Sequence, residues 1–449
     1  MTIYLAHFYL LMAGVAVALP VYWLVLRRDT YRRTFVVVVS LAVLALIQPG
    51  FAVVAVGLAY IAHQIVEAHK QRRLTTSRAL VMAVVIAVVT LAIGKYGQVM
   101  VGRLWGQNDW LWSHLVMPLG VSYFVFRLLQ YVFDHLRGVL QSNSFRDLLA
   151  FMLFVPTFPA GPLENYQGFW GKRSLTFDKD LFYRGIRRIV LGYFKKRFVV
   201  DFFFFDYLRP HATSPLAASW HFSAARPLQA SVFVVYFFIR AYIDLSAYTD
   251  LAIGFSALFG FRIMENFNNP LFKRNLSEFW RSWHISLSTW CRNNVYFPVF
   301  GATRKVWLGL YASMLTMGLW HYVSLNWTLW ALWHGTGLIA VNWWLKRKKA
   351  FRREHRGDPL WSRTSWRHAI LSPLWYVLTF CYVALGYSFV GTPDSAKALR
   401  VFAAAVVGPF VWLARHGAGG LAALVIVCAV VVASTVFVKL ARRRLQPAA

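Results

Sequence analysis

The chain has 449 residues, of which 58% are hydrophobic and only 14% are charged. Soluble globular proteins carry about 25% charged residues, so this composition excludes an ordinary soluble domain and predicts an integral membrane protein. The formal net charge of +31 is concentrated in basic clusters between apolar runs, which is typical of cytoplasmic loops and indicates contact with the lipid bilayer, not with nucleic acid. These clusters lie at residues 27–33, 70–73, 187–188, 195–197, 346–349 and 442–444.

A membrane-spanning helix needs about 20 mostly apolar residues, and such stretches recur along the whole sequence. Residues 3–26 predict a retained first helix, and the basic cluster after it predicts an N-terminus outside the cytoplasm. Pro49 and Gly50 interrupt the apolar stretch 34–68, which predicts two short helices joined there that return the chain to the cytoplasmic side. Further membrane helices are expected at residues 79–97, 111–136, 189–205, 230–261, 306–319, 327–344, 368–390, 399–413 and 419–440. We therefore predict a single all-α domain over residues 1–449 with about ten to twelve membrane segments.

Residues 145–170 depart from this pattern. Their apolar part is too short to span a bilayer and is broken by Pro156, Pro159, Gly161 and Pro162. We expect a re-entrant or interfacial segment, because irregular backbone persists at membrane depth only where protein buries it or where it lines a wet cavity. This is a first indication of an internal chamber. The most basic stretch, residues 346–356, is expected to form a loop.

Polar side chains within apolar helices are candidates for function, because each destabilises a membrane helix by about 2.5–3.5 kcal/mol at its centre. They concentrate between residues 241 and 334. Asp244 and Asp250 lie in one otherwise apolar helix, where Tyr248 shares a face with Asp244 and Ser246 shares a face with Asp250. A catalytic carboxylate and hydrogen bonds that fix helix packing both fit this pattern. The spacing points the two aspartates to different faces and favours the structural role.

Residues 278–290 combine aromatic, basic and hydroxyl side chains in a pattern typical of an amphipathic helix at the cytoplasmic interface. If this stretch is helical, Trp280, His284 and Ser288 share one face, which places an imidazole between an aromatic ring and a hydroxyl. Taken alone, His284 fits a packing role and a role in a site equally well.

A second histidine, His321, lies at the predicted end of an apolar helix, and the next helix carries Trp330, Trp333 and His334. A neutral imidazole in a low-dielectric chamber can take a proton from an alcohol and later return it, which contributes about 10²–10⁴-fold to a rate. No serine-hydrolase, zinc-protease or nucleotide-binding signature accompanies these residues. The three cysteines are too widely spaced to predict a disulfide framework or a metal site; they are Cys291, Cys381 and Cys428.

Six motifs occur in order along the middle of the chain, and together they resemble the membrane-bound O-acyltransferase superfamily. They are PLGVSY (118–123), AGPLENY (160–166), YTDLAIG (248–254), ENFNNP (265–270), FWRSWHISLSTW (279–290) and GLWH (318–321). The resemblance is to the bacterial branch that contains the alginate O-acetylation membrane subunit and the D-alanyl transferase for teichoic acid. The second and third motifs look nearer to the polysaccharide O-acetylation members. The resemblance implies a catalytic core over residues 118–345.

The same resemblance implies that His321, in the LWH motif, is the catalytic residue. His284 matches an earlier polar position of the family, and His334 resembles a second family histidine that precedes a glycine. Further side chains expected to support the site or line a substrate tunnel are Trp280, Trp283, Arg281, Ser288, Asn268, Asp250, Tyr248, Trp320 and Asn326. Two departures bear on the donor and acceptor: Tyr322 stands where the family usually has glycine, and Asn293-Asn294 replaces an acidic-aromatic pair.

From the resemblance we expect an O-acyltransferase of the bacterial cytoplasmic (inner) membrane, with helices around a central funnel or tunnel. No bound cofactor is expected; the donor would be acetyl-CoA or another acyl thioester, and the acceptor an extracytoplasmic polysaccharide. His321 would deprotonate the acceptor hydroxyl while His284 orients the donor or the intermediate. An extracytoplasmic acyltransferase- or esterase-like partner would complete the transfer. The alternatives are D-alanyl transfer to a teichoic-acid-like polymer, a transporter or lipid flippase, and a non-catalytic scaffold.

Overall fold

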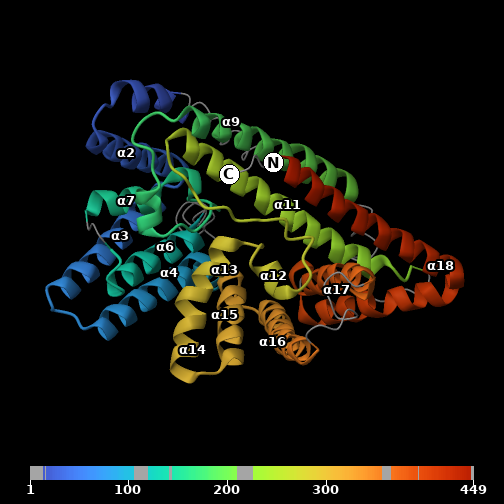
Figure 1. Ribbon diagram of the computed structural model, residues 1–449. Helices are drawn as coiled ribbons and strands as arrows, with labels where there is room; N and C mark the ends of the chain where they lie inside the picture. Colours follow the sequence, from blue (N-terminus) through green and yellow to red (C-terminus); the bar gives the residue numbers. More distant parts are fainter. Residues whose placement is uncertain are drawn as a thin grey trace. The chain divides into compact units, whose positions relative to one another are not determined.

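The computed structural model describes residues 14–15, 17–105, 120–140, 144–209, 226–355, 366–392 and 394–445. Within these ranges the regular elements are all helices, which confirms the predicted all-α class (Figure 1). In chain order they are η1 (Val21–Val25), α2 (Asp29–Ile47), α3 (Pro49–Lys70), α4 (Thr76–Trp105), α6 (Val121–Leu136), α7 (Phe145–Leu153), η2 (Val155–Thr157), α8 (Tyr166–Gly171), α9 (Lys179–Phe194), η3 (Lys195–Leu208), α11 (Gln229–Leu258), α12 (Leu276–Trp280), α13 (Ile285–Cys291), η4 (Arg292–Tyr296), α14 (Phe297–Thr303), α15 (Val306–His321), α16 (Leu325–Glu354), α17 (Trp366–Gly391) and α18 (Ser395–Leu445).

Six segments of the described helices are long and apolar enough to cross a membrane. They are Asp29–Ile47, Pro49–Lys70, Thr76–Gly97, Gln229–Leu258, Pro373–Gly391 and Ser395–Gly420. Gln48 alone separates α2 from α3, and Pro49 opens α3, so the predicted junction of two helices at this point is confirmed. The expectation that these helices are short was wrong, because each is long enough to cross a membrane. The total of ten to twelve segments stays a prediction. Residues 3–13 of the expected first helix, and residues 111–119, which include the start of the PLGVSY motif, lie outside the described residues.

The helices gather in two compact units, of which unit 1 comprises Met1–Lys195 and Leu245–Glu265. Within it α3 packs against α2, α4, α6 and α7 (Figure 1). α9 approaches the last part of α11 closely because glycines lie at the contact. A Cβ atom on Gly185 would lie 2.9 Å from the carbonyl oxygen of Gly254, and one on Gly192 would lie 2.9 Å from that of Ala247. Small residues of this kind let membrane helices pack backbone to backbone.

Residues 145–170 form the short helices α7, η2 and α8, none of which is long enough to span a bilayer. Arg127 of α6 organises the turn between α7 and η2. Its buried guanidinium donates hydrogen bonds to the carbonyl oxygens of Phe151 (3.2 Å), Met152 (3.2 Å) and Thr157 (2.7 Å). A helix end leaves its last carbonyls without partners inside the helix, and a side chain can satisfy them. The predicted break in the helical pattern is therefore confirmed, and protein buries this segment.

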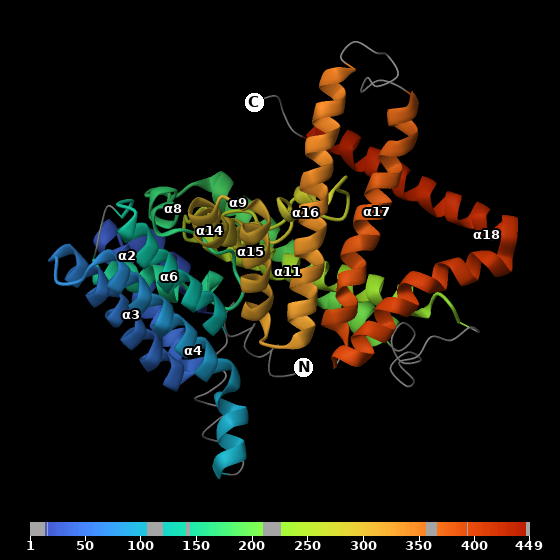
Figure 2. The same cartoon turned by 90° about the horizontal axis from the view of Figure 1, so that it is seen from below.

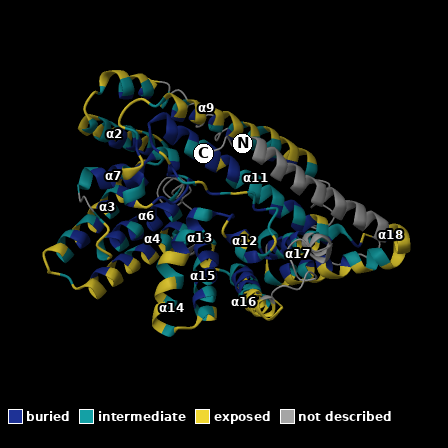
Figure 3. Ribbon diagram, viewed as in Figure 1, coloured by how far each residue is buried: buried dark blue, intermediate teal, exposed yellow. Residues whose placement is uncertain are grey.

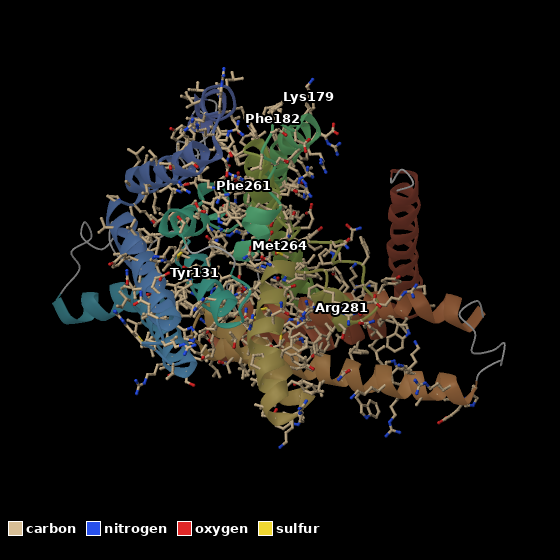
Figure 4. The ribbon with its side chains drawn as sticks, turned by 60° about the vertical axis from the view of Figure 1, so that its left-hand side comes forward. Tyr131, Lys179, Phe182, Phe261, Met264 and Arg281 are labelled. Carbon is tan, nitrogen blue, oxygen red and sulfur yellow. The ribbon has the colours of Figure 1, made fainter. Side chains whose placement is uncertain are left out.

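The segment that follows α11 packs back into unit 1 and reaches the AGPLENY motif. Phe261 stacks on Phe169 with ring centroids 4.6 Å apart, and it also contacts Phe154 at 4.7 Å. The backbone nitrogen of Met264 donates to Glu164 Oε2 at 3.0 Å. Figure 4 labels both Phe261 and Met264 on this segment. The segment between the third and fourth motifs is thereby tied to the AGPLENY motif through Glu164.

Unit 2 comprises Lys196–Asp244 and Asn266–Ala449. In it α13, η4 and α14 follow one another without interruption, and the wider π-helical turn η4 lies just before Pro298, which has no backbone N–H to donate. α14 packs along α15, α15 forms an antiparallel pair with α16, and α16 packs on α17, which packs on α18 (Figure 2). α13 is mostly buried, whereas α14 is largely exposed (Figure 3).

Two sequence expectations concern the last helices. The expected loop over residues 346–356 was wrong, because α16 continues to Glu354, and Lys and Arg are good helix formers. Arg356, the last residue of that stretch, lies outside the described residues. The predicted separation of residues 399–413 from 419–440 is a kink within α18, where Gly417 has φ 50° and ψ −130°. Glycine adopts such a conformation without a steric penalty.

Candidate active site

The stretch 278–290 does not form the single helix that the sequence predicted. α12 ends at Trp280, and α13 begins only after His284. His284 itself has φ 42° and ψ 53°, a left-handed conformation that residues other than glycine rarely adopt. The expectation that Trp280, His284 and Ser288 share one helical face was therefore wrong. The imidazole of His284 is presented from a sharp turn between two short helices.

A second segment, from the ENFNNP motif, pairs with this turn. The backbone oxygen of Asn266 accepts a hydrogen bond from the backbone nitrogen of Ile285 at 2.9 Å. The side-chain Oδ1 of Asn266 accepts two more, from the backbone nitrogen of Ser286 at 3.1 Å and from its hydroxyl at 2.9 Å. The first turn of α13, directly after His284, is thus anchored to Asn266. Sequence reasoning noted this motif but did not connect it with His284.

His321 is the last residue of α15, as the sequence predicted. The chain then turns, and the hydroxyl of Ser324 caps α16 by accepting a hydrogen bond from the backbone nitrogen of Trp327 at 3.3 Å. Trp327 therefore lies in the first turn of α16. Its indole stacks on the imidazole of His321, with ring centroids 4.4 Å apart and planes 15° apart. Sequence reasoning did not foresee this stacking, because it depends on how α15 and α16 pair.

Aromatic rings connect the three predicted histidines within unit 2. Trp320 contacts both His284, at a centroid distance of 6.5 Å, and His321, at 4.6 Å. Trp330 contacts both His321, at 6.3 Å, and His334, at 4.8 Å. The structure therefore brings the three histidines, which come from the α12–α13 turn, α15 and α16, into one cluster around these two tryptophans.

The three histidines differ in how accessible they are. His284 is 3% exposed and His334 is 1% exposed, whereas His321 is half-buried beside the exposed side chains of Tyr322 and Val323. Burial lowers the pKa of His284, which lies outside the six candidate spans, to about 4. His284 is therefore neutral near pH 7, and a neutral imidazole offers one N–H donor and one acceptor nitrogen. His321 is the most open of the three to an incoming molecule.

His334 is surrounded by rings. Its imidazole contacts Trp280 at 5.3 Å and Trp330 at 4.8 Å, and its Nδ1 has no hydrogen-bond partner in the part of the chain that the structure describes. Gly386 makes room for it, since a Cβ there would lie 2.9 Å from His334 Nε2. This environment favours a packing role, and the supporting role in the site stays a prediction.

Trp283 and Ser288 lie on the two sides of the His284 turn. Trp283 stacks on Phe279, with planes 21° apart and ring centroids 5.4 Å apart. The hydroxyl of Ser288 donates to the carbonyl oxygen of Trp283 at 3.1 Å. Both side chains therefore stabilise the turn from which His284 is presented.

Three other predicted residues of unit 2 are placed differently. Asn326 is buried at the start of α16 and donates from Nδ2 to the carbonyl oxygen of Thr392 at 3.2 Å. Arg281, labelled in Figure 4, and Asn268 are both exposed. An exposed guanidinium is suited to attract an anionic group of a substrate, whereas Asn326 serves packing between α16 and the end of α17.

The last two predicted residues, Tyr248 and Asp250, belong to unit 1. Asp250 is buried and pairs with Arg188 and with Lys195, whose Nζ lies 2.6 Å from Asp250 Oδ2. Lys195 Nζ also donates to the hydroxyl of Ser246 at 3.2 Å, which confirms that Ser246 and Asp250 share a helix face. Tyr248 is exposed. The two ion pairs support the structural role that the sequence favoured for Asp250.

The histidine cluster is suited to acid–base chemistry. It supplies an accessible imidazole at the end of α15 and a buried neutral one at the α12–α13 turn. Across the described residues, no group of three or more His, Cys, Asp or Glu side chains is arranged to hold a metal ion. Cys291 is buried in α13, and Cys381 is exposed.

One protein family and several known proteins are similar to this chain. Residues 1–382 match the profile of the MBOAT, membrane-bound O-acyltransferase family. A Pseudomonas aeruginosa protein named "Probable alginate O-acetylase AlgI" is 29% identical over 350 residues, which cover 74% of this chain and 61% of that protein. An Azotobacter vinelandii protein of the same name is 31% identical over 348 residues, 74% of this chain and 64% of that protein. A Bacillus subtilis protein named "Teichoic acid D-alanyltransferase" is 29% identical over 296 residues, 62% of this chain and 70% of that protein. The chain thus spans about three fifths of the alginate O-acetylases it matches.

Proposed function

Because the chain belongs to the membrane-bound O-acyltransferase family, we propose that it transfers an acetyl group from a cytoplasmic thioester, such as acetyl-CoA, to hydroxyl groups of an extracytoplasmic polysaccharide. The relatives named as alginate O-acetylases support acetyl as the group and a polysaccharide as the acceptor. The six candidate spans and the family support a location in the bacterial inner membrane. The N-terminus lies outside the cytoplasm in this proposal.

The accessible position of His321 at the end of α15 is the observation that carries this proposal. The carbonyl groups at the C-terminal end of a helix favour a positive charge nearby, and an imidazole acquires one when it accepts a proton. The face of Trp327, stacked on His321, also favours a cationic ring. These features support His321 as the general base on an acceptor hydroxyl, a role that contributes about 10²–10⁴-fold to a rate.

In the proposed reaction, His321 takes the proton of the acceptor hydroxyl as its oxygen attacks the thioester carbonyl. The tetrahedral intermediate then expels the thiolate, which receives that proton from His321, so that an ester and a free thiol are formed. His284 is neutral and can donate one hydrogen bond, which suits it to orient the donor or to stabilise the oxyanion. Trp320, in contact with both imidazoles, keeps them at one site.

We further propose that the acyl group crosses the membrane through a passage between the helices while its large carrier stays in the cytoplasm. In this route the hydroxyl acylated at His321 belongs to an intermediate carrier. An extracytoplasmic acyltransferase- or esterase-like protein then transfers the acyl group from that ester to a hydroxyl of the polymer, which releases the carrier hydroxyl. The exposed Arg281 beside the site is a candidate contact for an anionic part of the donor.

D-alanyl transfer to a teichoic-acid-like polymer is a second candidate. The similarity to the Bacillus subtilis protein, of which the alignment covers 70%, supports it. The two candidates differ in the group transferred. Mass spectrometry of envelope polymers from cells with and without the intact chain distinguishes them, because an acetyl ester and a D-alanyl ester have different masses and only the latter carries an amine.

The test of the proposed chemistry compares two histidine variants. His321→Ala is expected to reduce ester formation by at least about 10²-fold while the protein still inserts in the membrane. The matched control is His355→Ala, because His355 is an exposed histidine at the end of α16. Full ester formation by inserted His321→Ala protein would overturn the mechanism. Movement of an unmodified lipid or polymer across the membrane by that variant would instead indicate a transporter.

A further inference from the structure

The turn that carries His284 is held by hydrogen bonds on both sides. After His284, the backbone and the side chain of Asn266 accept the three hydrogen bonds from Ile285 and Ser286 described above. Before His284, the backbone nitrogen of Asn268 donates to the carbonyl oxygen of Ser282 at 2.9 Å. Asn266 and Asn268, which belong to one segment, therefore hold the chain on either side of Trp283 and His284.

Of the two residues held in this way, His284 has unusual backbone geometry. His284 has φ 42°, and a side chain with a Cβ is disfavoured there because the Cβ crowds the following carbonyl oxygen. Such a conformation persists only where the surrounding structure imposes it, and it is a reason to look for function. Asn266 is itself 2% exposed, and its side-chain oxygen is committed to Ser286. Buried hydrogen bonds of this kind fix geometry, because water cannot replace them.

The consequence of the turn is the direction of the imidazole. In a continuous helix His284 would follow the path of α12, whereas the left-handed turn directs its ring to Phe267, at a centroid distance of 6.3 Å, and to Trp320, at 6.5 Å. Trp320 is the residue directly before His321 in α15. The turn thus determines where the buried imidazole lies relative to the proposed base.

We propose that Asn266 is a positioning residue that, through its hydrogen bonds to the first turn of α13, holds His284 in the left-handed conformation that acyl transfer requires. This inference rests on the proposed role of His284 in the reaction. Asn266 acts through His284 and does not itself contact the reacting groups. An active-site group displaced by about 1 Å can lower the rate about 10²-fold, so the loss of these bonds has a measurable effect on rate.

The matched control for Asn266 is Asn275. Its side-chain oxygen accepts a hydrogen bond from the backbone nitrogen of Glu278 at 2.9 Å and so caps α12, the other short helix at this turn. Asn266→Ala and Asn275→Ala each remove an asparagine that anchors a helix start in unit 2. We expect both to lower thermal stability to a similar extent. Only Asn266→Ala should lower the rate of acyl transfer per folded molecule, by about 10²-fold, with the KM for the thioester unchanged.

Two further variants separate positioning from a general structural role. The first variant is His284→Gly, which removes the imidazole and introduces a glycine that tolerates the left-handed conformation. In this background Asn266→Ala should cause no additional loss of rate, because both changes affect the same imidazole. Asn266→Asp retains an oxygen that can accept both bonds and should recover most of the rate. If Asn266→Ala does not fold, Ser286→Ala removes only the hydroxyl bond and should show a smaller loss that is likewise absent in the His284→Gly background.

A measurement that does not depend on catalysis completes the test. The NMR chemical shifts of ¹³Cα and ¹³Cβ of His284 report its backbone conformation. They are measured on histidine-labelled protein in lipid nanodiscs and assigned by their absence from the spectrum of His284→Gly. We expect left-handed shifts in wild type and in Asn275→Ala, and their loss in Asn266→Ala. Unchanged shifts in Asn266→Ala, or rate losses that multiply in the double variant, would overturn the inference. A wild-type protein that transfers no acyl group while its shifts follow this pattern would overturn the proposed function and leave the positioning intact.

Discussion

A single methyl group at Gly318 tests whether the pairing of α15 with α16 determines the site. Gly318 lies one helical turn before His321 and faces α16. A Cβ there would lie 2.6 Å from the backbone oxygen of Trp327 and 3.1 Å from the Cβ of Ala331. Both neighbours are parts of the α16 helix that cannot rotate away. Gly318→Ala therefore forces the two helices apart at the point where His321 stacks on Trp327.

The sign of the stability change follows from two opposing terms. Alanine is about 1 kcal/mol more favourable than glycine in a helix interior. Overpacking of a tight core contact destabilises by about 1–3 kcal/mol, and the contact with a backbone oxygen puts Gly318→Ala at the upper end. The net expectation is a loss of roughly 1–2 kcal/mol. At Gly301 in α14, a Cβ would meet nothing within 4 Å, so Gly301→Ala should retain the gain of up to about 1 kcal/mol.

Thermal unfolding in detergent and acyl transfer per folded molecule are the two measurements. Gly301→Ala should unfold at or above the wild-type temperature with full activity. Gly318→Ala should unfold at a lower temperature, and its rate should fall by up to about 10²-fold because the shift of α15 displaces His321. A Gly318→Ala protein as stable as Gly301→Ala would refute the reasoning, since the close contact would then have no energetic consequence.

Two further perturbations follow from buried polar groups. Arg127→Met leaves three carbonyl oxygens at the α7–η2 turn without their donor and should destabilise the folded protein by roughly 3 kcal/mol or more. The control is Arg137→Met, at the exposed end of the same helix, which should change the stability by no more than about 0.5 kcal/mol. Thermal unfolding of both variants is the measurement. In the unfolded chain His284 takes up a proton below its ordinary pKa of about 6.5, whereas in the folded protein it does so only near pH 4. The folded protein therefore loses stability as the pH falls from 6.5 to about 4, by up to about 3 kcal/mol. Unfolding curves that shift equally for wild type and His284→Asn across this range would contradict the assignment.

The sequence predicted those parts of the fold that depend on local signals. Apolar stretches of membrane length predicted helices, Pro49 predicted the junction between α2 and α3, and prolines and glycines predicted the broken segment over residues 145–170. His321 was placed at a helix end because a polar stretch follows it directly in the sequence. Each of these features is determined by residues adjacent in the chain.

The features that were missed depend on residues distant in the chain. The His284 turn interrupts a stretch whose own composition favours a helix, and the hydrogen bonds that stabilise the interruption come from Asn266. The stacking of Trp327 on His321 requires the antiparallel pairing of α15 with α16. The continuation of α16 to Glu354 was missed for a different reason, since the density of charge was interpreted as a loop although Lys and Arg favour helices.

The positions of the two histidines at helix boundaries support the different tasks that we propose for their imidazoles. His321 ends α15, where the helix terminus favours the positive charge that a base acquires. His284 precedes α13 and is buried, conditions that keep its ring neutral and available as a hydrogen-bond donor. Two identical side chains in a site are useful as acid–base partners only if their surroundings separate their protonation behaviour. In the mechanism that we propose, His321 is the base and His284 is the hydrogen-bond donor, so exchanging these two roles would require rebuilding the turn between α12 and α13.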